Sequence, residues 1–134
     1  MDVSSTDMCF ACGKKNECGL KLDFDVEEGK VVSHFSLDER FQGWKGIAHG
    51  GIVATILDEA MAWAVMSLEI QAVTIELNVK YKRPTPLKKR LRVVGEVNEE
   101  PRKIIKAHAK ILDETDTILA LSTGVYMKVG KQNT

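Results

Sequence analysis

The sequence predicts an α+β domain in which one antiparallel sheet of five or six strands wraps around a single long helix. Three observations lead to this prediction. One stretch, from Gly46 to Ser67, has the apolar spacing of a long helix. On both sides of it, apolar and polar residues alternate with the period of two that is typical of half-buried strands. Turn signals separate the segments, so the order along the chain is two strands, the helix and four strands, or ββαββββ.

The composition is that of one globular domain. With 134 residues, 44% of them hydrophobic, the chain is long enough to bury a core and short enough to favour oligomers. We expect a single domain over residues 1–134, with a cysteine-containing N-terminal loop at 1–19 and a frayed tail at 130–134. Nineteen basic and nineteen acidic residues cancel, which argues against nucleic acid or an anionic membrane as partner. We see neither a secretory signal nor an apolar run of membrane-spanning length, so we expect a cytoplasmic protein.

The three cysteines lie close together near the N-terminus, at Cys9, Cys12 and Cys18. An odd number in a chain expected in the cytoplasm argues against a disulfide framework. Zinc would need a fourth ligand, which His34 or His108 would have to supply through the fold, and the C-x2-C-x5-C spacing matches no strong zinc motif. We therefore expect free thiols and no metal.

The two strands before the helix are predicted to form an antiparallel hairpin. Leu20–Val26 alternates apolar with polar residues, Glu28-Gly29 is a turn signal, and Val31–Leu37 alternates again. His34 falls on the less apolar side of the second strand, where an exposed position is favoured over a catalytic role. The stretch from Asp38 to Ala48 has no sustained period, which predicts an ordered loop.

The helix is apolar on almost every side, yet it carries two adjacent carboxylates near its middle. Opposite its bulky face runs a small and polar stripe of Ala54, Thr55, Asp58 and Ala62, with Glu59 at the margin. A surface helix would carry many charged residues on its outer side, so we expect protein to cover both sides of this helix. A carboxylate in such a dry slot is a stronger base, and its small neighbours leave room for a substrate. The projection favours Asp58 over Glu59 as this base. The alternative is a buried polar group that only hydrogen-bonds a neighbouring subunit.

The start of the helix supplies the second half of a possible site. His49, Gly50 and Gly51 precede it without any Ser, Thr, Asp or Asn to cap the first turn, so several backbone N–H groups should lack partners. The positive end of the helix would then polarise a carbonyl. His49 would either take part in polarising this carbonyl or only hold the loop in place through a hydrogen bond. Phe41 and Trp44, just before, would either wall a pocket or anchor the loop to the core, with anchoring favoured.

Four strands are predicted after the helix. Val73–Lys82 alternates most clearly, and two prolines in the segment RPTPL end it. Strands at about 91–98, 103–112 and 117–128 follow, separated by a turn with Pro101 and by a turn at Asp113–Asp116. A sheet wrapped around one side of a helix leaves the other side uncovered. A second copy of the chain is the simplest cover, so we expect a homodimer with the small, polar stripe near the subunit boundary.

Basic residues concentrate between Lys80 and Arg92, where seven occur without an acid, among them Arg83, Lys89 and Arg90. This cluster would suit the phosphates of a nucleotide such as coenzyme A if it lies at the mouth of a pocket. A solvated turn is an equally good explanation for any one of these residues.

Three motifs together resemble the hotdog-fold acyl-coenzyme A thioesterases of the phenylacetate-degradation branch. The first is His49-Gly50-Gly51, followed after six residues by Asp58. The second is the strand Thr74–Tyr81 with Pro84 after it. The third is Cys9-Phe10-Ala11-Cys12-Gly13, with Asn16, Gly19 and Leu20. The resemblance covers nearly the whole domain.

The resemblance implies roles for individual residues. Asp58 would be the catalytic carboxylate, which activates water or attacks directly, and Gly51 would bind the thioester oxygen through its N–H, with His49 in the same turn. Thr74 would match a hydroxyl that helps to place the water. Several relatives have an asparagine where this chain has Gly43. The other candidate residues for substrate binding are Gly50, Thr55, Glu59, Gln42, Arg83, Lys89 and Arg90.

The expected function is hydrolysis of an acyl-coenzyme A to a free acid and coenzyme A by a homodimer, or by a dimer of dimers, without metal or bound cofactor. One alternative is a non-catalytic module that binds or senses acyl-coenzyme A, which the fold supports equally well. Such a module needs an output surface, and we see no helix-turn-helix or second domain in the sequence. A hydratase of the same fold is a further alternative, but the sequence lacks the Asp-x4-His spacing expected of it.

Overall fold

The computed structural model describes residues 6–99 and 102–130 of the chain. The predicted turn at Pro101 and the predicted frayed tail, apart from Gly130, lie outside the described residues. The strands before the helix are β1 (Asp25–Glu27) and β2 (Lys30–Phe35), and the helix is α1 (Gly50–Met66). The strands after it are β3 (Gln71–Tyr81), β4 (Leu91–Glu99), β5 (Ile104–Leu112) and β6 (Ile118–Gly130). The predicted order ββαββββ is confirmed, with a short 3-10 helix at Glu39–Phe41. In the described parts of the chain, no helix has both the length and the apolar character needed to cross a membrane.

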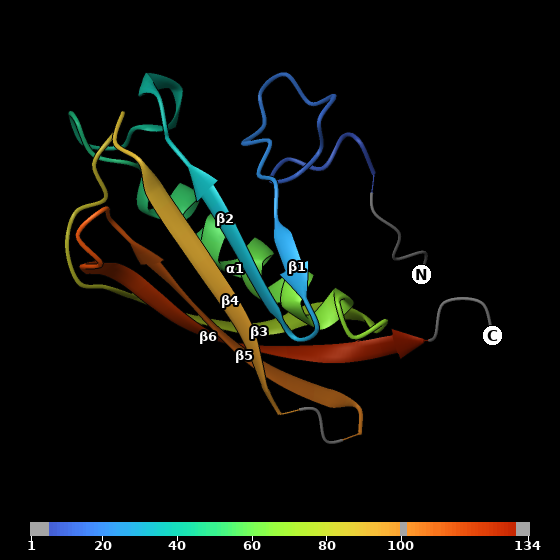
Figure 1. Ribbon diagram of the computed structural model, residues 1–134. Coiled ribbons are helices and arrows are strands. Elements are labelled where there is room, and N and C mark those ends of the chain that lie inside the picture. Colours follow the sequence, from blue (N-terminus) through green and yellow to red (C-terminus); the bar gives the residue numbers. More distant parts are fainter. Residues whose placement is uncertain (1–5, 100–101, 131–134) are drawn as a thin grey trace.

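The six strands form one antiparallel sheet in the order β1-β2-β4-β5-β6-β3. The sheet curves around α1, which lies along its concave face (Figure 1). The strand that follows α1 in the sequence, β3, pairs with the last strand and forms one edge of the sheet. The three-residue strand β1 forms the other edge. The sheet therefore has one short edge, formed by β1, and one long edge, formed by the eleven residues of β3.

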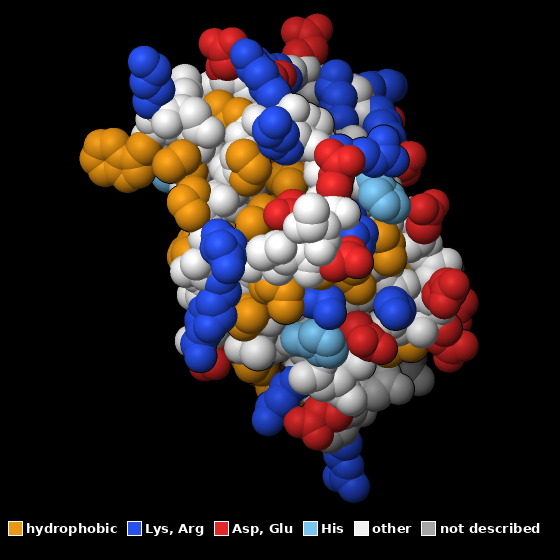
Figure 2. All heavy atoms as spheres, turned by 60° about the vertical axis from the view of Figure 1, so that its left-hand side comes forward, with side chains coloured by type: hydrophobic (Ala, Val, Ile, Leu, Met, Phe, Trp, Pro, Cys, Tyr) orange, Lys and Arg blue, Asp and Glu red, His pale blue; other side chains and the backbone are white. Residues whose placement is uncertain are grey.

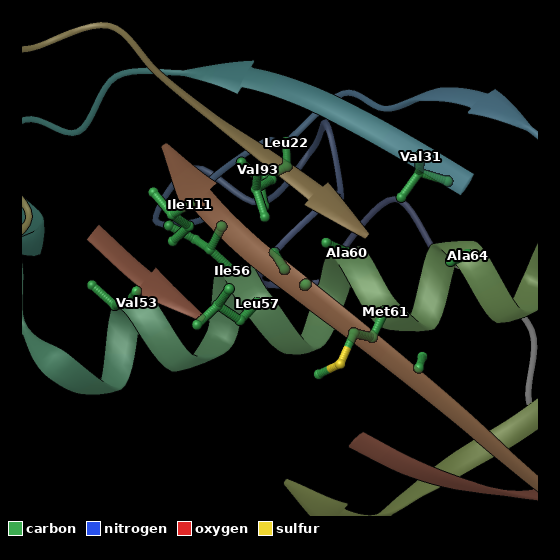
Figure 3. Close-up of a cluster of buried hydrophobic side chains, with 14 of the residues drawn as sticks. Leu22, Val31, Val53, Ile56, Leu57, Ala60, Met61, Ala64, Val93 and Ile111 are labelled. Atoms are coloured by element: carbon green, nitrogen blue, oxygen red, sulfur yellow. The ribbon is translucent and has the colours of Figure 1, made fainter. Parts of the chain in front are cut away.

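The helix packs its apolar face against the middle of the sheet, as predicted. Figure 3 shows side chains of α1 interleaved with those of β2, β4 and β5. Each large apolar side chain buried in this way stabilises the fold by about 1.5–3 kcal/mol. Gly95 on β4 sets the distance between the two layers, because a Cβ atom there would lie 2.5 Å from the carbonyl oxygen of Ala60. The buried residues of the helix are Val53, Ile56, Leu57, Ala60, Met61, Ala64 and Val65.

The predicted strand at Leu20–Val26 is wrong over most of its length, since only its last two residues belong to β1. The backbone N–H groups of Leu20 and Leu22 donate instead to carbonyl groups of the N-terminal loop, at Phe10 and Ala11. Lys21 between them has a φ of 53°, which interrupts the extended backbone. The alternating apolar residues here pack this loop onto the core rather than forming a ladder with the sheet.

The remaining strand predictions are confirmed within about two residues. On β2, Val31 and Ser33 are buried and His34 is exposed, as expected from the alternation. On β5 alternate residues are buried, namely Ile105, Ala107, Ala109 and Ile111.

The prediction that β3 buries alternate residues is wrong for the single chain. A bulge between Thr74 and Glu76 shifts the register against β6. All residues from 74 to 78 are exposed in the single chain, including Ile75 at 50% and Leu77 at 38%. An apolar, exposed edge of this length is a surface that proteins normally cover.

Candidate active site

Asp58 lies in the middle of α1 and is half-buried. Its Oδ1 atom accepts hydrogen bonds from two hydroxyl groups, Thr74 Oγ1 at 3.0 Å and Tyr126 Oη at 2.8 Å. The hydrogen bonds of the described residues include none to the other oxygen, Oδ2. The carboxylate is therefore held by one oxygen, while the second can accept a proton or attack an electrophile.

Tyr126, on β6, is a hydrogen-bond partner of Asp58 and a candidate site residue that the sequence did not indicate. It is 1% exposed, and its ring lies over Gly124, where a Cβ atom would come within 2.9 Å of the ring carbon Cε1. Burial and the neighbouring charge of Asp58 raise the pKa of Tyr126 well above its ordinary value, so the phenol stays a neutral donor. The sequence predicted a strand here, but no sequence signal linked the hydroxyl of Tyr126 to the helix.

Glu59, although adjacent to Asp58, faces a different part of the molecule. Its Oε2 atom accepts a hydrogen bond from Trp63 Nε1 at 3.1 Å and lies 3.8 Å from the sulfur of Cys9. The structure thus separates the two carboxylates of the helix: Asp58 faces strands β3 and β6, and Glu59 lies under the N-terminal loop. Among the described residues, Glu59 makes no hydrogen bond to Thr74 or Tyr126, the partners of Asp58.

The expectation that the first helical turn lacks a cap is wrong. His49 is the N-cap residue, and its Nδ1 atom accepts the N–H of Gly51 at 2.9 Å. An accepting Nδ1 carries no proton, so the neutral ring bears its proton on Nε2. Tyr81, at the end of β3, donates to the carbonyl of Gly50 at 2.6 Å. Two hydrogen bonds therefore hold this turn, one from the N–H of Gly51 to His49 and one from Tyr81 to the carbonyl of Gly50.

A hollow of about 470 Å³ opens in front of the helix. The exposed ring of Trp44 and the backbone turn before α1 border it, while Phe41 is buried and anchors the loop. The predicted anchoring role is confirmed for Phe41, whereas Trp44 is 81% exposed. The lining residues are Gly43, Trp44, Ala48, His49 and Gly50.

Gly43 and Gln42 both contribute to the shape of the loop before the helix. A Cβ atom at Gly43 would lie 3.0 Å from the Cα atom of His49, so a side chain there would push against the capping residue. The side-chain oxygen of Gln42 accepts the N–H of Gly46 at 3.1 Å, which closes the loop on itself. Thr55 donates to the carbonyl of Gly51 at 2.9 Å, within the first turns of the helix.

The basic segment lies beside the loop that leads to the hollow. The N–H of Ala48 donates to the carbonyl of Thr85 at 2.9 Å, and the N–H of Lys88 donates to the carbonyl of Leu37 at 2.7 Å. In Figure 1 the two loops run together at the upper end of the sheet, and Figure 2 shows Lys and Arg side chains gathered at that end, with acidic ones among them. The candidate residues Arg83, Lys89 and Arg90 are all exposed. No contact described for them reaches Asp58.

Comparison with known proteins gives a consistent result. The profile of the Thioesterase superfamily matches residues 45–120, which include the helix and the strands β3, β4 and β5. Acyl-coenzyme A thioesterase THEM4 of Mus musculus is 33% identical over 108 residues, covering 79% of this chain and 46% of its own length. The chain spans about half the length of the curated relatives it matches.

Solved structures share the fold. One is the protein smu.793 of Streptococcus mutans, bound to acetyl CoA, with a TM-score of 0.79, 21% identity, and coverage of 84% of this chain and 91% of that one. Another is the E. coli PaaI protein from the phenylacetic acid degradation operon, with a TM-score of 0.80, 21% identity, and coverage of 84% and 83%. Both the profile match and the sheet wrapped around one helix lead to the same conclusion: this chain belongs to the Thioesterase superfamily and has the hotdog fold.

Proposed function

We propose that this protein is an acyl-coenzyme A thioesterase that hydrolyses the thioester to a free acid and coenzyme A. The observation that carries the proposal is the state of Asp58, which is held through Oδ1 by Thr74 and Tyr126 and keeps Oδ2 for chemistry. The names of the relatives, acyl-coenzyme A thioesterases, support the same activity. The reaction as proposed uses only protein groups and water, without metal or bound cofactor.

In the proposed reaction Asp58 Oδ2 either takes a proton from the attacking water or attacks the thioester carbon itself. If Oδ2 acts as the base, the water oxygen bonds to the thioester carbon, the carbon–sulfur bond breaks, and the proton taken by Asp58 passes to the departing sulfur, which gives the free acid and the thiol. If Oδ2 is the nucleophile, it forms a mixed anhydride as the carbon–sulfur bond breaks and the thiolate takes a proton from water; a water molecule then hydrolyses the anhydride to the free acid and restores the carboxylate. The hydroxyl of Thr74 lies 3.0 Å from Oδ1, a position from which it also helps to orient a water molecule.

The thioester oxygen is proposed to dock at the start of α1. Because the N–H of Gly51 donates to His49 Nδ1, a docked oxygen has to share this donor. The Nε2–H of His49 points to the opposite side of the ring from Nδ1, so it would donate to a different atom of the substrate. The docked oxygen would be stabilised by the N–H of Gly51 at the positive end of the helix, and His49 would contribute by holding this turn in place.

Substrate binding is proposed to use the hollow in front of the helix and the basic segment beside it. Arg83, Lys89 and Arg90 would pair with the phosphates of coenzyme A, and Gln42, Gly50 and Thr55 would line the path to Asp58. The acetyl CoA bound to the Streptococcus mutans protein supports a coenzyme A site in this fold. Glu59 lies under the N-terminal loop, so a direct contact with substrate is not part of the proposal.

The active form is proposed to be a homodimer that pairs through the exposed edge of β3, with further assembly into a dimer of dimers possible in the same fold. Ile75 and Leu77 would lose their exposed apolar surface there. The half-buried stripe of α1 around Asp58 would then lie near the subunit boundary. Neither a membrane nor nucleic acid is a proposed partner.

Release of free thiol from a panel of acyl-coenzymes A tests this function. The wild-type chain should turn over at least one of them, and Asp58→Asn should lower kcat by about 100-fold or more, because the amide cannot act as a base. Asp25→Asn on the exposed strand β1 removes the same charge far from the site and should leave turnover unchanged. Equal rates for wild type and Asp58→Asn contradict the proposal, and tight binding without turnover identifies a non-catalytic binding module.

A further inference from the structure

The N-terminal loop brings two cysteines onto the helix beside Glu59. One sulfur each from Cys9 and Cys12 and one carboxylate oxygen of Glu59 all lie within 4.8 Å of one another. Cys18 is exposed and is not part of this cluster. Nor do His34 and His108 complete it, although the sequence had suggested them as possible ligands. Two thiolates and a carboxylate form a donor set that suits a thiophilic divalent cation.

The backbone around the cysteines holds both sulfurs on the same side of a tight turn. The N–H of Cys12 donates to the sulfur of Cys9 at 3.4 Å, and the N–H of Gly13 donates to the carbonyl of Cys9 at 2.8 Å. Gly13 has no room for a side chain, since a Cβ atom would lie 2.3 Å from the carbonyl oxygen of Asp7. The N–H of Cys12 and the tight turn therefore fix where the sulfur of Cys9 lies.

Trp63 orients the carboxylate of Glu59. The indole N–H of Trp63 donates to its Oε2 atom at 3.1 Å, and the indole ring stacks on Phe24 with ring centroids 5.7 Å apart. In metal sites, a carboxylate that binds the ion is commonly held in position by a hydrogen bond from a neighbouring residue that does not itself bind the ion. The turn and the carboxylate are thus positioned independently, one by the N-terminal loop and the other by the helix.

The distance between the Cys9 sulfur and the Glu59 carboxylate is close to the one expected around a zinc ion. Zinc–sulfur and zinc–oxygen bonds of about 2.3 and 2.0–2.2 Å at a tetrahedral angle place sulfur and oxygen roughly 3.5–3.7 Å apart. The sulfur of Cys9 and Oε2 of Glu59 are 3.8 Å apart, close to this value, and the sulfur of Cys12 lies within 4.8 Å of the ligand atoms of both residues. Burial and hydrogen bonds to Glu59 and Cys9 raise the pKa of Cys12, so a cation that binds its thiolate has to displace this proton.

We propose that Cys9, Cys12 and Glu59 bind one Zn²⁺ ion, with water as the fourth ligand, and that the ion fastens the N-terminal loop to helix α1. Because Glu59 adjoins Asp58 in the helix, the ion would stiffen the segment that carries the proposed catalytic carboxylate. The site does not depend on the proposed thioesterase activity, and its test does not use that activity.

The test is metal binding by the full chain after treatment with a chelator and a reductant. Zinc titrated in competition with a chromophoric chelator should bind at one ion per chain and should raise Tm. Cobalt in its place should give the charge-transfer absorption of a cobalt thiolate. Cys9→Ser and Cys12→Ser should each weaken that absorption and the affinity, whereas Cys18→Ser should behave as wild type.

Two further variants keep the test decisive if a cysteine variant fails to fold. Glu59→Gln preserves the shape of the side chain but removes its charge, and should weaken zinc binding while leaving the thiolate absorption in place. Trp63→Phe removes the supporting donor together with part of the ring, and should weaken binding by about 10-fold. Absence of zinc binding at one ion per chain overturns the proposal, as does equal binding by wild type and Glu59→Gln. A Cys9–Cys12 disulfide that forms in air, in a chain that binds no zinc when reduced, identifies a redox pair instead.

Discussion

The phenol hydroxyl of Tyr126 and the carboxylate oxygen Oδ1 of Asp58, 68 positions apart in the sequence, lie 2.8 Å apart and share a hydrogen bond. The same hydroxyl lies 3.1 Å from the backbone carbonyl of Asp58. Strand β6 therefore determines where the carboxylate of the helix points. Thr74 on β3 adds a second hydroxyl to the same oxygen, so two neighbouring strands orient one side chain.

Replacing Tyr126 with Phe should lower kcat for thioester hydrolysis by about 10-fold to 100-fold, because a hydrogen bond to a charged group is worth about 1.5–3 kcal/mol. Steady-state thiol release measures the effect. Thr74→Val removes the other hydroxyl, and the double variant should lose less than the product of the two single effects, since both hydroxyls serve one oxygen. An unchanged kcat in Tyr126→Phe would show that this contact does not orient a catalytic group.

The raised pKa of Tyr126 predicts how stability depends on alkaline pH. An unfolded tyrosine ionises near pH 10. In the folded chain Tyr126 keeps its proton at that pH, so the unfolded state binds fewer protons and the free energy of unfolding falls as the pH rises above about 10. In a Tyr81→Phe background, which leaves Tyr126 as the one remaining tyrosine, phenolate absorbance should appear together with loss of the far-UV circular dichroism signal. Phenolate absorbance near pH 10 in a chain that is still folded would contradict this.

The exposed edge of β3 predicts the effect of charge on assembly. Leu77→Lys should convert the proposed dimer to a monomer, because pairing along this edge would bury the new ammonium group. Light scattering coupled to size-exclusion chromatography measures the mass. Val26→Lys is the matched control, since Val26 is 47% exposed on β1 at the opposite edge. A wild-type chain that is monomeric and fully active would refute the proposed subunit boundary.

Gly95 predicts a stability effect that has no link to the site. Gly95→Ala should lower the free energy of unfolding by about 1–3 kcal/mol, because the new methyl group meets the backbone of Ala60 and cannot be accommodated by a side-chain rotation. Urea unfolding followed by circular dichroism measures this. Gly50→Ala serves as the control, since a Cβ atom there has only ordinary contacts, the nearest at 3.5 Å from Tyr81 Oη, and should change the stability by less than about 0.5 kcal/mol. Equal stability of the two variants would mean that the layers can separate at little cost.

Periodicity in the sequence was sufficient for most of the fold. The helix and the strands β2, β4, β5 and β6 follow patterns that repeat every few residues, and such patterns reflect which face of an element is buried. The pattern misled at Leu20–Val26, where the apolar residues are buried by a loop. It also misled at β3, because a bulge and an edge position leave Ile75 and Leu77 exposed within one chain.

By itself, the sequence determined the class of the fold, the position of Asp58 on the small-residue stripe of the helix, and the membership that its motifs indicated. Only the tertiary structure decided which groups surround each carboxylate: Tyr126 and Thr74 at Asp58, and Cys9 and Trp63 at Glu59. It also showed that His49 caps the helix through Nδ1. Contacts such as that between Tyr126 and Asp58 depend on the order of the strands and on the curvature of the sheet around the helix. Local periodicity carries no information about either, because it records only which residues face inward and not what they meet there.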